Sequence, residues 1–325
     1  HLQSVKMNAD SVNILMLGGA KRVSMARKFR HAAQSMGLNC RIYSYEMDLD
    51  VPIACEATVI RGLRWSDADV YDHIASVCGH FGINVVIPFV DGAVAVASEF
   101  ARRYPGVAFA PSCAPHLAEM MFDKVRSNEA FIANGLPVPA TCYPGKSTPS
   151  FPLIAKPRHG SASKGIVRLD FPQELEAMMP VADDYLFQEF ITNRREYTVD
   201  CYVGMETGDV LAAIPRVRDA VIGGEVSRTT VVHDPRISEL VEKTLKTMNL
   251  RGAVTVQLIE DLDTDRLMLM EINPRLGGGA VAAVHAGADL PAMILAEALG
   301  GQPEPCTAWK NIVVARYLDE VVFDN

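Results

Sequence analysis

The first third of the chain alternates short apolar runs with amphipathic segments that end at glycine. The apolar runs have the length and composition of buried strands, and they lie at residues 12–18, 39–45 and 83–89. Segments 21–36 and 67–81 lie between them, have the periodicity of helices, and stop at Gly37 and Gly82. Short apolar strands separated by helices predict βαβ units with a parallel sheet. We therefore expect a Rossmann-like α/β domain from about residue 12 to residue 111.

The turn after the first strand lacks the glycine pattern of a dinucleotide-binding site. Its sequence is Gly18-Gly19-Ala20-Lys21, whereas that site needs GxGxxG to bring the backbone against a pyrophosphate. Glu46 lies near the end of the second strand, where an acid that binds ribose would be, but a lone acid there is also a common loop residue. We predict no NAD binding and exclude a Rossmann-type oxidoreductase.

The composition limits the classes of binding partner and the cellular compartment that we expect for this protein. The net charge is −8 and no long basic run occurs, so we expect neither a nucleic acid nor a membrane as partner. The seven cysteines are scattered singly without a CxxC, which favours a reducing compartment over a disulfide framework or a zinc site. The most apolar long stretch, residues 277–301, is interrupted by charged residues and a proline, and the first apolar run is too short for a signal peptide. We expect a cytoplasmic protein.

A predicted hairpin in the C-terminal third places three oxygen donors on one face. Residues 253–260 and 266–273 alternate as strands around the polar turn EDLDTD. The even-numbered positions are apolar and predict the core-facing side: Val254, Val256, Leu258, Met268, Met270 and Ile272. With the turn centred near residue 264, Gln257 lies opposite Glu271 and shares its face with Asn273, and opposed Cβ atoms are about 5 Å apart.

Those three side chains have the chemistry of a magnesium site. Carboxylate and carbonyl oxygens are the ligands that Mg²⁺ prefers and shares with substrate phosphates. Arg275 follows two residues after Asn273, where it could meet negative charge on a transferring phosphoryl group. A solvated hairpin face is the other interpretation of polar residues there. The three donors in register, followed by Pro-Arg and the glycines 277–279, favour the metal site.

Two further segments predict contacts to a nucleotide. Lys156 ends an apolar strand and precedes HGSASKG, residues 159–165, whose N–H groups and hydroxyls could meet phosphate oxygens and close as a lid. The loop is not a Walker A motif, and by itself it is equally well a hairpin turn, just as an isolated lysine is usually a surface charge. QEFI, residues 188–191, offers a strand edge that can pair with adenine. Glu196 can take two ribose hydroxyls or pair with the neighbouring arginines.

The chain resembles the ATP-grasp superfamily over about residues 12–299. It is most similar to one ATP-binding half of carbamoyl phosphate synthase large subunits and to short stand-alone carboxylate-amine ligases. The resemblance rests on Asp123-Lys124, AKPRHGSASKG, QEFI…REYTVD, VQL and EINPR, of which the last two in hairpin register are the specific part. It implies a Rossmann-like domain followed by an ATP-grasp module of two α+β subdomains. The implied boundaries are 7–112 for the first domain, 113–185 for the small lid subdomain, and 186–325 for the C-terminal subdomain with the metal site.

The resemblance also implies a role for each matched residue. The phosphates of ATP and the reacting phosphoryl group would be held by Lys124, Lys156 and Arg275. The lid loop would close through Gly160, Ser161, Ser163 and Gly165. The adenosine would be met by Gln188, Glu189, Phe190, Ile191 and Glu196. One or two Mg²⁺ (or Mn²⁺) ions would be bound by Gln257, Glu271 and Asn273. The acceptor side, where arginine forks suit a carboxylate but also serve as surface charge, is bordered by Arg216, Arg218 and Arg228.

The implied activity is an ADP-forming carboxylate-amine ligase that uses ATP and Mg²⁺. A substrate carboxylate would become an acyl phosphate, and an amine, or less often a thiol, would displace phosphate. The resemblance implies a small carboxylate and an amine as substrates and allows a homodimer. Two alternatives stay open: carboxyphosphate or carbamate phosphorylation as in carbamoyl phosphate synthase, and a non-catalytic ATP-binding regulatory subunit. Complete carbamoyl phosphate synthesis is not expected, because residues 222–227 lack the histidine of that family and only one ATP-grasp unit is present.

Overall fold

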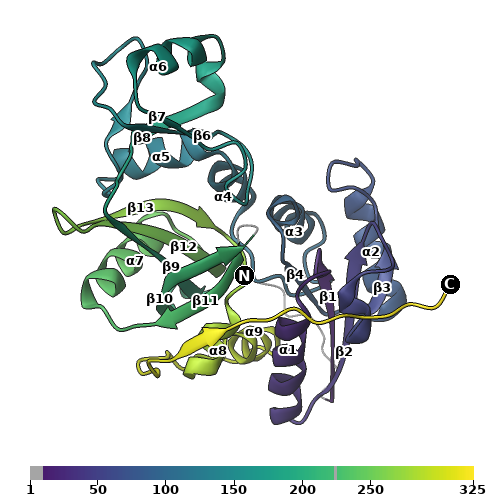
Figure 1. The fold of residues 1–325 in the computed structure, drawn as a ribbon. Helices are drawn as coiled ribbons and strands as arrows, with labels where there is room; N and C mark the ends of the chain where they lie inside the picture. Colours follow the sequence, from purple (N-terminus) through teal and green to yellow (C-terminus); the bar gives the residue numbers. More distant parts are fainter. Residues whose placement is uncertain (1–9, 223–224) are drawn as a thin grey trace.

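The N-terminal part of the molecule is a four-stranded parallel sheet. The structure, a computed structural model, describes residues 10–222 and 225–325 (Figure 1). The sheet order is β3-β2-β1-β4, with strands β1 (Ser11–Leu17), β2 (Asn39–Glu46), β3 (Thr58–Arg61) and β4 (Val85–Pro88). One face packs on α1 (Val23–Ser35), and the other packs on α2 (Val70–Phe81) and α3 (Asp91–Arg103); the 3₁₀ helix η1 (Pro52–Cys55) lies beside α1. The parallel βαβ arrangement predicted from the sequence is confirmed.

The strand order reverses between β1 and β4. The chain runs outward from β1 through β2 and β3, then returns to place β4 on the other side of β1. The loops after β1 and β4 therefore diverge, which opens the crevice where ligands commonly bind at parallel sheets. Glu46 holds the first of these loops, because its half-buried carboxylate accepts the N–H groups of Gly19 and Ala20, and burial raises its pKa. This acid, considered above as a ribose ligand, instead fixes the loop that carries Arg22.

A small antiparallel sheet forms the teal lobe at the upper left of Figure 1. Its order is β5-β8-β6-β7, with strands β5 (Thr141–Cys142), β6 (Leu153–Pro157), β7 (Val167–Leu169) and β8 (Tyr185–Glu189). It is accompanied by α5 (Lys124–Ala133), α6 (Pro172–Met178) and the 3₁₀ helix η2 (Met179–Asp184). The lobe has its own small core around Leu153, Ala155 and Phe187, separate from the cores of the other two sheets.

The sequence predicts one helix over residues 117–134, and the structure corrects this to two helices. These are α4 (Pro115–Phe122) and α5, and the break between them lies at Asp123. Asp123 has an extended backbone (φ −106°, ψ 107°), and its carboxylate accepts two N–H groups from the first turn of α5. A carboxylate in this N-cap position starts a new helix. The break places Lys124 in the first turn of α5.

The C-terminal part is a six-stranded sheet whose neighbouring strands are all antiparallel. Its order is β13-β12-β9-β10-β11-β14, with strands β9 (Arg194–Val203), β10 (Val210–Ile222), β11 (Glu225–Val231), β12 (Gly252–Asp261), β13 (Arg266–Asn273) and β14 (Val313–Ala315). One face packs on α4 and α7 (Pro235–Thr247). Part of the other face packs on α8 (Val281–Ala286) and α9 (Leu290–Ala298), in a core shared with α1 (Figure 1).

Period-two alternation on β9 gives this second face a polar end. Val199 and Cys201 lie in the core with α7, so the intervening Thr198 and Asp200 face the opposite side. Tyr202, two residues further on that side, belongs to the core beneath α8 and α9. Helices therefore cover one end of the face, and polar side chains occupy the other.

A β-bulge in β13 changes the predicted hairpin. Gln257 pairs with Glu271, as predicted, so the register at the proposed metal site is confirmed. The register then shifts, so that Leu258 pairs with Leu269 and Met270 is the extra residue. One residue is inserted, so the alternation of side chains changes phase. Between Glu271 and the turn, even-numbered residues of β13 point to the side that odd-numbered residues would otherwise occupy.

The inversion corrects the predicted core face. Met268 lies with Ile191 and Ile259 in a small cluster on the polar side of the sheet, and Met270 packs against that cluster. The prediction that even-numbered residues face the α7 core is right for β12 and for Ile272, and wrong for Met268 and Met270. The sequence pattern could not reveal the error, because Leu269 and its two methionine neighbours are all apolar.

The predicted fold class is confirmed: a parallel α/β sheet is followed by two sheets of antiparallel strands with helices. Within residues 10–222 and 225–325, no helix has both the length and the apolar composition needed to cross a membrane. The three sheets meet around the polar end of the six-stranded sheet, where the predicted site residues lie.

Candidate functional site

A narrow pocket of about 50 Å³ lies between the small sheet and the six-stranded sheet. Its apolar walls are Pro139, Ile154, Phe190, Ile191, Ile259 and Met270. Its polar groups are Lys156, Gln188, Glu189, Arg194 and Glu196. Apolar walls with a few fixed polar groups are typical of sites for small aromatic ligands. The bulge in β13 supplies part of this wall, since it turns Met270 toward the pocket.

Lys156 is fixed by a buried chain of hydrogen bonds. Its Nζ donates to Gln188 Oε1 (3.2 Å), and Gln188 Nε2 donates to Asn128 Oδ1 (3.0 Å). Asn128 Nδ2 donates in turn to Thr141 Oγ1 (3.0 Å), which donates to the Pro139 carbonyl (3.2 Å). Each of these groups donates to the next, so the Gln188 carbonyl is held toward the ammonium group. We call this set of residues the Lys156 relay.

The charge of Lys156 is set by burial and by two acids. The side chain is 7% exposed, and burial lowers its pKa below the ordinary 10.5. Glu271 and Glu196 oppose that shift, because their negative charges favour the ammonium form. The cation therefore lies between the predicted metal ligand and the predicted ribose ligand.

Phe190 and Ile191 form the rim of the narrow pocket. The Phe190 ring lies between two guanidinium groups, with Arg168 at 4.4 Å and Arg194 at 5.1 Å from its centroid. The Phe190 N–H donates to the Pro152 carbonyl (3.0 Å), whereas the Ile191 N–H has no partner in the part of the chain that the structure describes. The rim thus offers one backbone donor from Ile191, and the Phe190 N–H is already used.

The loop at residues 159–165 connects β6 to β7 and is exposed. Lys124 Nζ donates to the Gly160 carbonyl (2.8 Å), so the first turn of α5 holds the start of the loop. Ser161 and Ala162 reach across to line the second pocket described below. The loop therefore spans from the small sheet to the six-stranded sheet.

The three predicted metal ligands lie together at the polar end of β12 and β13. Asn273 Nδ2 donates to Glu271 Oε1 (3.3 Å). Two cations neighbour the group: Lys124 Nζ lies 3.9 Å from Glu271 Oε2, and Arg218 Nη1 donates to Gln257 Oε1 (3.3 Å). Among the described residues, no cluster of three His, Cys, Asp or Glu side chains could hold a metal, so the two amide oxygens are needed to complete this donor set.

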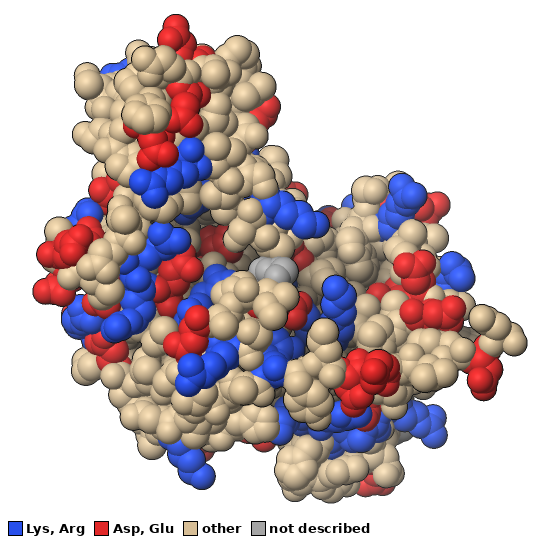
Figure 2. Space-filling model, viewed as in Figure 1, with Lys and Arg blue, Asp and Glu red and all other residues tan. Residues whose placement is uncertain are grey.

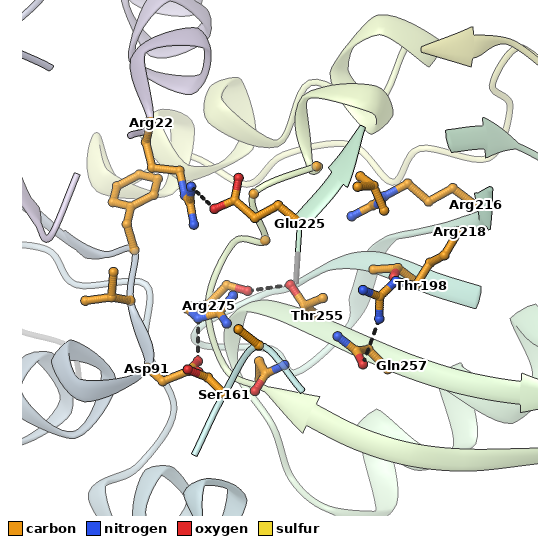
Figure 3. Close-up of a pocket in the computed structure, with 18 residues that line it drawn as sticks. Arg22, Asp91, Ser161, Thr198, Arg216, Arg218, Glu225, Thr255, Gln257 and Arg275 are labelled. Atoms are coloured by element: carbon orange, nitrogen blue, oxygen red, sulfur yellow. Dashed lines mark hydrogen bonds and ion pairs between the residues drawn. The ribbon is translucent and has the colours of Figure 1, made fainter. Parts of the chain in front are cut away.

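A larger cavity of about 200 Å³ adjoins these three residues. We call it the arginine pocket, because its lining includes Arg22, Arg216, Arg218 and Arg275 (Figure 3). Its other polar lining residues are Asp91, Ser161, Thr198, Glu225, Thr255, Gln257 and Asn273. On the molecular surface, basic side chains gather around the hollow beneath the small lobe (Figure 2).

Two ion pairs join the N-terminal sheet to the six-stranded sheet across this pocket (Figure 3). Arg275 Nε donates to Asp91 Oδ1 (2.7 Å) at the start of α3, and the Arg275 carbonyl accepts the Thr255 hydroxyl (2.7 Å). Arg22, after β1, donates to Glu225 Oε1 on β11 (2.8 Å). Burial raises the pKa of Glu225, but Arg22, Arg316 and Lys21 together outweigh it and hold that pKa below its usual value. Both pairs use the diverging loops of the N-terminal sheet.

The glycine run after Arg275 makes room for the charged groups of the pocket. Arg216, which is 3% exposed, donates from Nε and Nη2 to Asp200 at 2.8 and 3.3 Å. A Cβ atom on Gly279 would lie 2.8 Å from Arg216 Nη1, and one on Gly278 would lie 3.1 Å from the Glu225 carboxyl carbon. Larger residues at these positions would displace both groups.

Comparisons with known proteins identify the fold of this chain. Residues 182–321 match a family model described as ATP-grasp in the biosynthetic pathway with the Ter operon. An N5-carboxyaminoimidazole synthetase from Staphylococcus aureus, complexed with ADP, is similar in structure over 97% of this chain and 85% of that chain, with 17% identity and a TM-score of 0.74. The chain has the ATP-grasp fold. The ATP-grasp resemblance drawn from the sequence is confirmed.

Other solved structures match this chain over different shares of their own length. An L-amino acid ligase from Bacillus licheniformis matches over 90% of this chain and 75% of that chain, with 18% identity and a TM-score of 0.69. A pyruvate carboxylase from Rhizobium etli matches at 18% identity and a TM-score of 0.68 over 91% of this chain, which spans only 30% of that protein. A search of curated protein sequences gave no match.

Most of the residues predicted for the ATP-grasp site lie around the two pockets. Near the narrow pocket are Lys156, Gln188, Glu189, Phe190, Ile191 and Glu196. Near the arginine pocket are Lys124, Ser161, Arg216, Arg218, Gln257, Glu271, Asn273 and Arg275. Arg228 is exposed on β11 and does not line the arginine pocket; Gly160, Ser163 and Gly165 lie in the exposed loop without lining either pocket.

Sequence reasoning missed five residues that shape the candidate site: Arg22, Asp91, Asn128, Asp200 and Glu225. Arg22 and Glu225 are 203 positions apart, so no local pattern connects them. Asp200 could have been found, because it alternates with apolar residues in YTVDCYV and so predicts a carboxylate on the face opposite the core. Asn128 carries no signal, since it sits within a helix among mixed residues.

Proposed function

We propose that the protein is an ATP- and Mg²⁺-dependent ligase that activates a carboxylate as an acyl phosphate for attack by an amine. The observation that carries this proposal is the order of groups across the site. An apolar pocket with one free backbone N–H adjoins a buried lysine, then a carboxylate with two amides, then a cavity lined by four arginines. That order suits a base, its phosphates, a divalent cation and an anionic acceptor.

In this proposal adenine occupies the narrow pocket. Its ring would lie among Ile154, Ile191 and Met270, and the Ile191 N–H would donate to a ring nitrogen. Glu196 would accept from the ribose hydroxyls. Gln188 has a different role from the direct contact implied by the resemblance: it faces Lys156 and orients it. Lys156 and Lys124 would then meet the phosphates, with the loop at residues 159–165 closing over them.

The donor set of Gln257, Glu271 and Asn273 fits Mg²⁺ in type: one carboxylate and two amide carbonyls, all oxygen donors. Lys124 and Arg218 lie against Glu271 and Gln257, which supports a cation in this position. When bound, the cation would neutralise phosphate charge. Mn²⁺ has similar ligand preferences and would be accepted as well.

The chemistry would need no protein nucleophile. A carboxylate oxygen of the substrate would attack the γ-phosphorus, the bond from that phosphorus to the bridging oxygen would break, and ADP would leave. The amine would then attack the acyl carbon and expel phosphate, losing a proton to solvent. Arg275 and the two lysines would stabilise the negative charge on the transferring group, and positioning would supply most of the rate enhancement.

Release of ADP from Mg²⁺-ATP tests the proposal. The assay uses pools of small carboxylic acids with and without pooled amines, and bicarbonate in a separate arm. ADP formation that requires an acid, and that rises when an amine is added, is the expected result. Formation with bicarbonate alone would replace the proposal with carboxyphosphate or carbamate chemistry. Tight Mg²⁺-ATP binding by calorimetry without turnover in any arm would support a non-catalytic ATP-binding subunit instead.

A further inference from the structure

Arg216 has a donor that nothing in the described chain satisfies. Its Nε and Nη2 face Asp200, which is 1% exposed, but Nη1 is buried and has no hydrogen-bond partner within residues 10–222 and 225–325. A buried donor without an acceptor loses its hydrogen bond to water and gains none in return, so such a group calls for an explanation. Arg216 lines the arginine pocket, and its side chain extends into that space (Figure 3).

The strand register separates Arg216 from the proposed reaction centre. Glu271 pairs with Gln257, Gln257 with Thr198, and Thr198 with Arg216, so the four residues form one row across β13, β12, β9 and β10. Strands lie about 4.8 Å apart, which puts the ends of the row roughly 14 Å apart at Cα. The long arginine side chain covers part of that gap. A group held by Arg216 therefore differs from the group that reacts beside Glu271.

Two glycines keep the space next to the Arg216 guanidinium free for a ligand. A Cβ on Gly279 would lie 2.8 Å from Nη1, and a Cβ on Gly277 would lie 3.7 Å from Nη2. Glycine at these positions lets the backbone between β13 and α8 pass beside the guanidinium without filling the space. The neighbouring lining residues Thr198 and Thr255 add hydroxyl groups rather than apolar surface.

The arginine pocket also limits the size and charge of its occupant. Its volume of about 200 Å³ suits a small molecule, and its lining contains four arginines and two acids, Asp91 and Glu225. Asp91 pairs with Arg275, Glu225 with Arg22, and Asp200 pairs with Arg216, so these arginines outnumber the acids by four to three. The pocket therefore favours a small, polar, anionic molecule over an apolar or cationic one.

We propose that the acid substrate carries a second carboxylate, and that Arg216 binds it. The inference rests on the proposed ligase function and names its substrate class: small dicarboxylic acids, one end at the reaction centre beside Glu271 and Arg275, the other at Arg216. Asp200 acts as the positioning residue, because its carboxylate holds Nε and Nη2 and turns Nη1 toward the pocket. Arg228, exposed outside the pocket, has no part in this binding.

The test compares dicarboxylic acids of three to six carbons with their monoamides, which match in size and lose one charge. Calorimetry in the presence of Mg²⁺-ADP measures binding without turnover. The wild-type protein should bind at least one diacid about tenfold or more tightly than its monoamide, as expected for a charge-assisted hydrogen bond in a buried site. Equal affinity within every pair, or binding of none of them, would overturn the proposal.

Variants then assign the preference to Arg216. Arg216→Lys keeps the positive charge beside Asp200 but lacks the Nη1 donor, so the preference for the diacid should fall to about twofold or less. Gly279→Ala keeps the arginine but puts a Cβ 2.8 Å from the present position of Nη1, so that donor is displaced or blocked and the preference should weaken as well. Arg41→Ala removes an exposed arginine of β2 and should leave the preference unchanged. An intact preference in both folded variants would assign the second carboxylate elsewhere and refute the inference.

The ADP assay separates this inference from the proposed function. Acid-dependent ADP release that is equal for diacids and monoamides would keep the ligase function and refute the role of Arg216. No ADP release with any acid, alongside selective diacid binding that depends on Arg216, would refute the ligase function and leave a dicarboxylate site. Each of these two outcomes therefore refutes only one of the two proposals and leaves the other standing.

Discussion

At the scale of single residues, the site combines buried charge with fixed polar partners. Lys156 is almost fully buried but faces the Gln188 carbonyl and lies near two carboxylates. Arg216 is as buried and has Asp200 as its partner. A buried ion that lost its partner would be strongly destabilising, so these groups are tied to their neighbours and cannot be read as surface charges.

The lowered pKa of Lys156 predicts a pH dependence of nucleotide binding. As the pH rises through that lowered pKa, the ammonium group loses its proton before a free lysine would, and the affinity for Mg²⁺-ATP should fall at a pH below 10.5. Between the lowered pKa and the unfolded value the unfolded chain binds more protons, so stability rises with pH in that window. Titration calorimetry from pH 7.5 to 10 measures the affinity.

The matched variants for this pH dependence are Lys156→Arg and Lys156→Met. Arginine stays protonated over that range, so the affinity of Lys156→Arg should be weaker but flat with pH. Lys156→Met should bind Mg²⁺-ATP weakly at every pH. If the wild-type affinity does not change across the range, Lys156 does not lose its proton there, and the predicted pH dependence is wrong. If Lys156→Met binds Mg²⁺-ATP as tightly as wild type, Lys156 does not contact the phosphates.

Glu271→Gln tests the metal assignment with little change of shape. The residue lies on the polar side of β13 and outside the main core, so the melting temperature should stay within a few degrees of wild type. Metal-dependent ADP formation should fall by at least about a hundredfold, because an amide does not balance the charge of a divalent cation. Wild-type turnover in Glu271→Gln would remove this residue from the metal site.

At the scale of elements, local breaks in helices and strands position side chains of the candidate site. The Asp123 N-cap ends α4, starts α5, and also binds Arg158 Nε at 2.9 Å. The bulge at Met270 turns this residue toward the narrow pocket and places Met268 in the adjoining apolar cluster. Both features place functional side chains at points where the sequence pattern predicts continuous elements.

Asp123→Ala should destabilise the fold by about 1–2 kcal/mol, since it removes an N-cap and the Arg158 pair together. Asp123→Asn keeps the cap and loses the ionic pairing, so it should cost clearly less. Urea denaturation measures both. If the two substitutions cost the same, the cap is not what stabilises the start of α5.

Asn128→Leu tests the Lys156 relay. The substitution leaves the Gln188 amide without its buried acceptor and should cost about 1–3 kcal/mol of stability. In the folded fraction, the KM for ATP should rise more than kcat falls, because the Gln188 carbonyl no longer holds Lys156 in place. Glu129→Ala, next to it on α5, is the control for a change in that helix. An unchanged KM in folded Asn128→Leu would make the relay purely structural.

Much of the fold and part of the site could be predicted from the sequence. Apolar residues at the even-numbered positions within 254–258 and 268–272 were enough to pair Gln257 with Glu271, because both strands bury one face. The bulge could not be predicted, since Met268, Leu269 and Met270 are all apolar and none of them marks a change of side. The break at Asp123 was missed, although an aspartate before a helix is a capping signal, because the residues on both sides continue the helical pattern. The ion-pair partners of Arg22 and Arg275 depend on how the sheets pack against each other, and no local sequence pattern predicts that packing.

At the scale of the whole molecule, the site exists only where the three sheets meet. The narrow pocket needs the small sheet and the six-stranded sheet, and the arginine pocket needs the N-terminal sheet as well. The Arg22–Glu225 and Arg275–Asp91 pairs join the N-terminal sheet to the six-stranded sheet. The topological reversal between β1 and β4 explains why the loops after those strands are the ones that reach the site.

A double-mutant cycle on Arg22→Met and Glu225→Gln measures one of these inter-sheet contacts. Glu225 is partly exposed, so the coupling should be modest, about 0.5–1 kcal/mol at low salt, and should decrease as salt is raised. Urea denaturation of the four proteins gives the coupling energy. A coupling of zero at low salt would mean that the pair does not help to join the two sheets.

The most direct test of the central claim follows oxygen atoms. Small dicarboxylic acids labelled with ¹⁸O in their carboxylates are incubated with the protein, Mg²⁺-ATP and amines, and the released phosphate is analysed by mass spectrometry. If the carboxylate attacks the γ-phosphorus and the amine expels phosphate from an acyl phosphate, one ¹⁸O atom appears in each phosphate. Phosphate without ¹⁸O would mean that water attacks ATP directly, and it would contradict the proposed ligase mechanism.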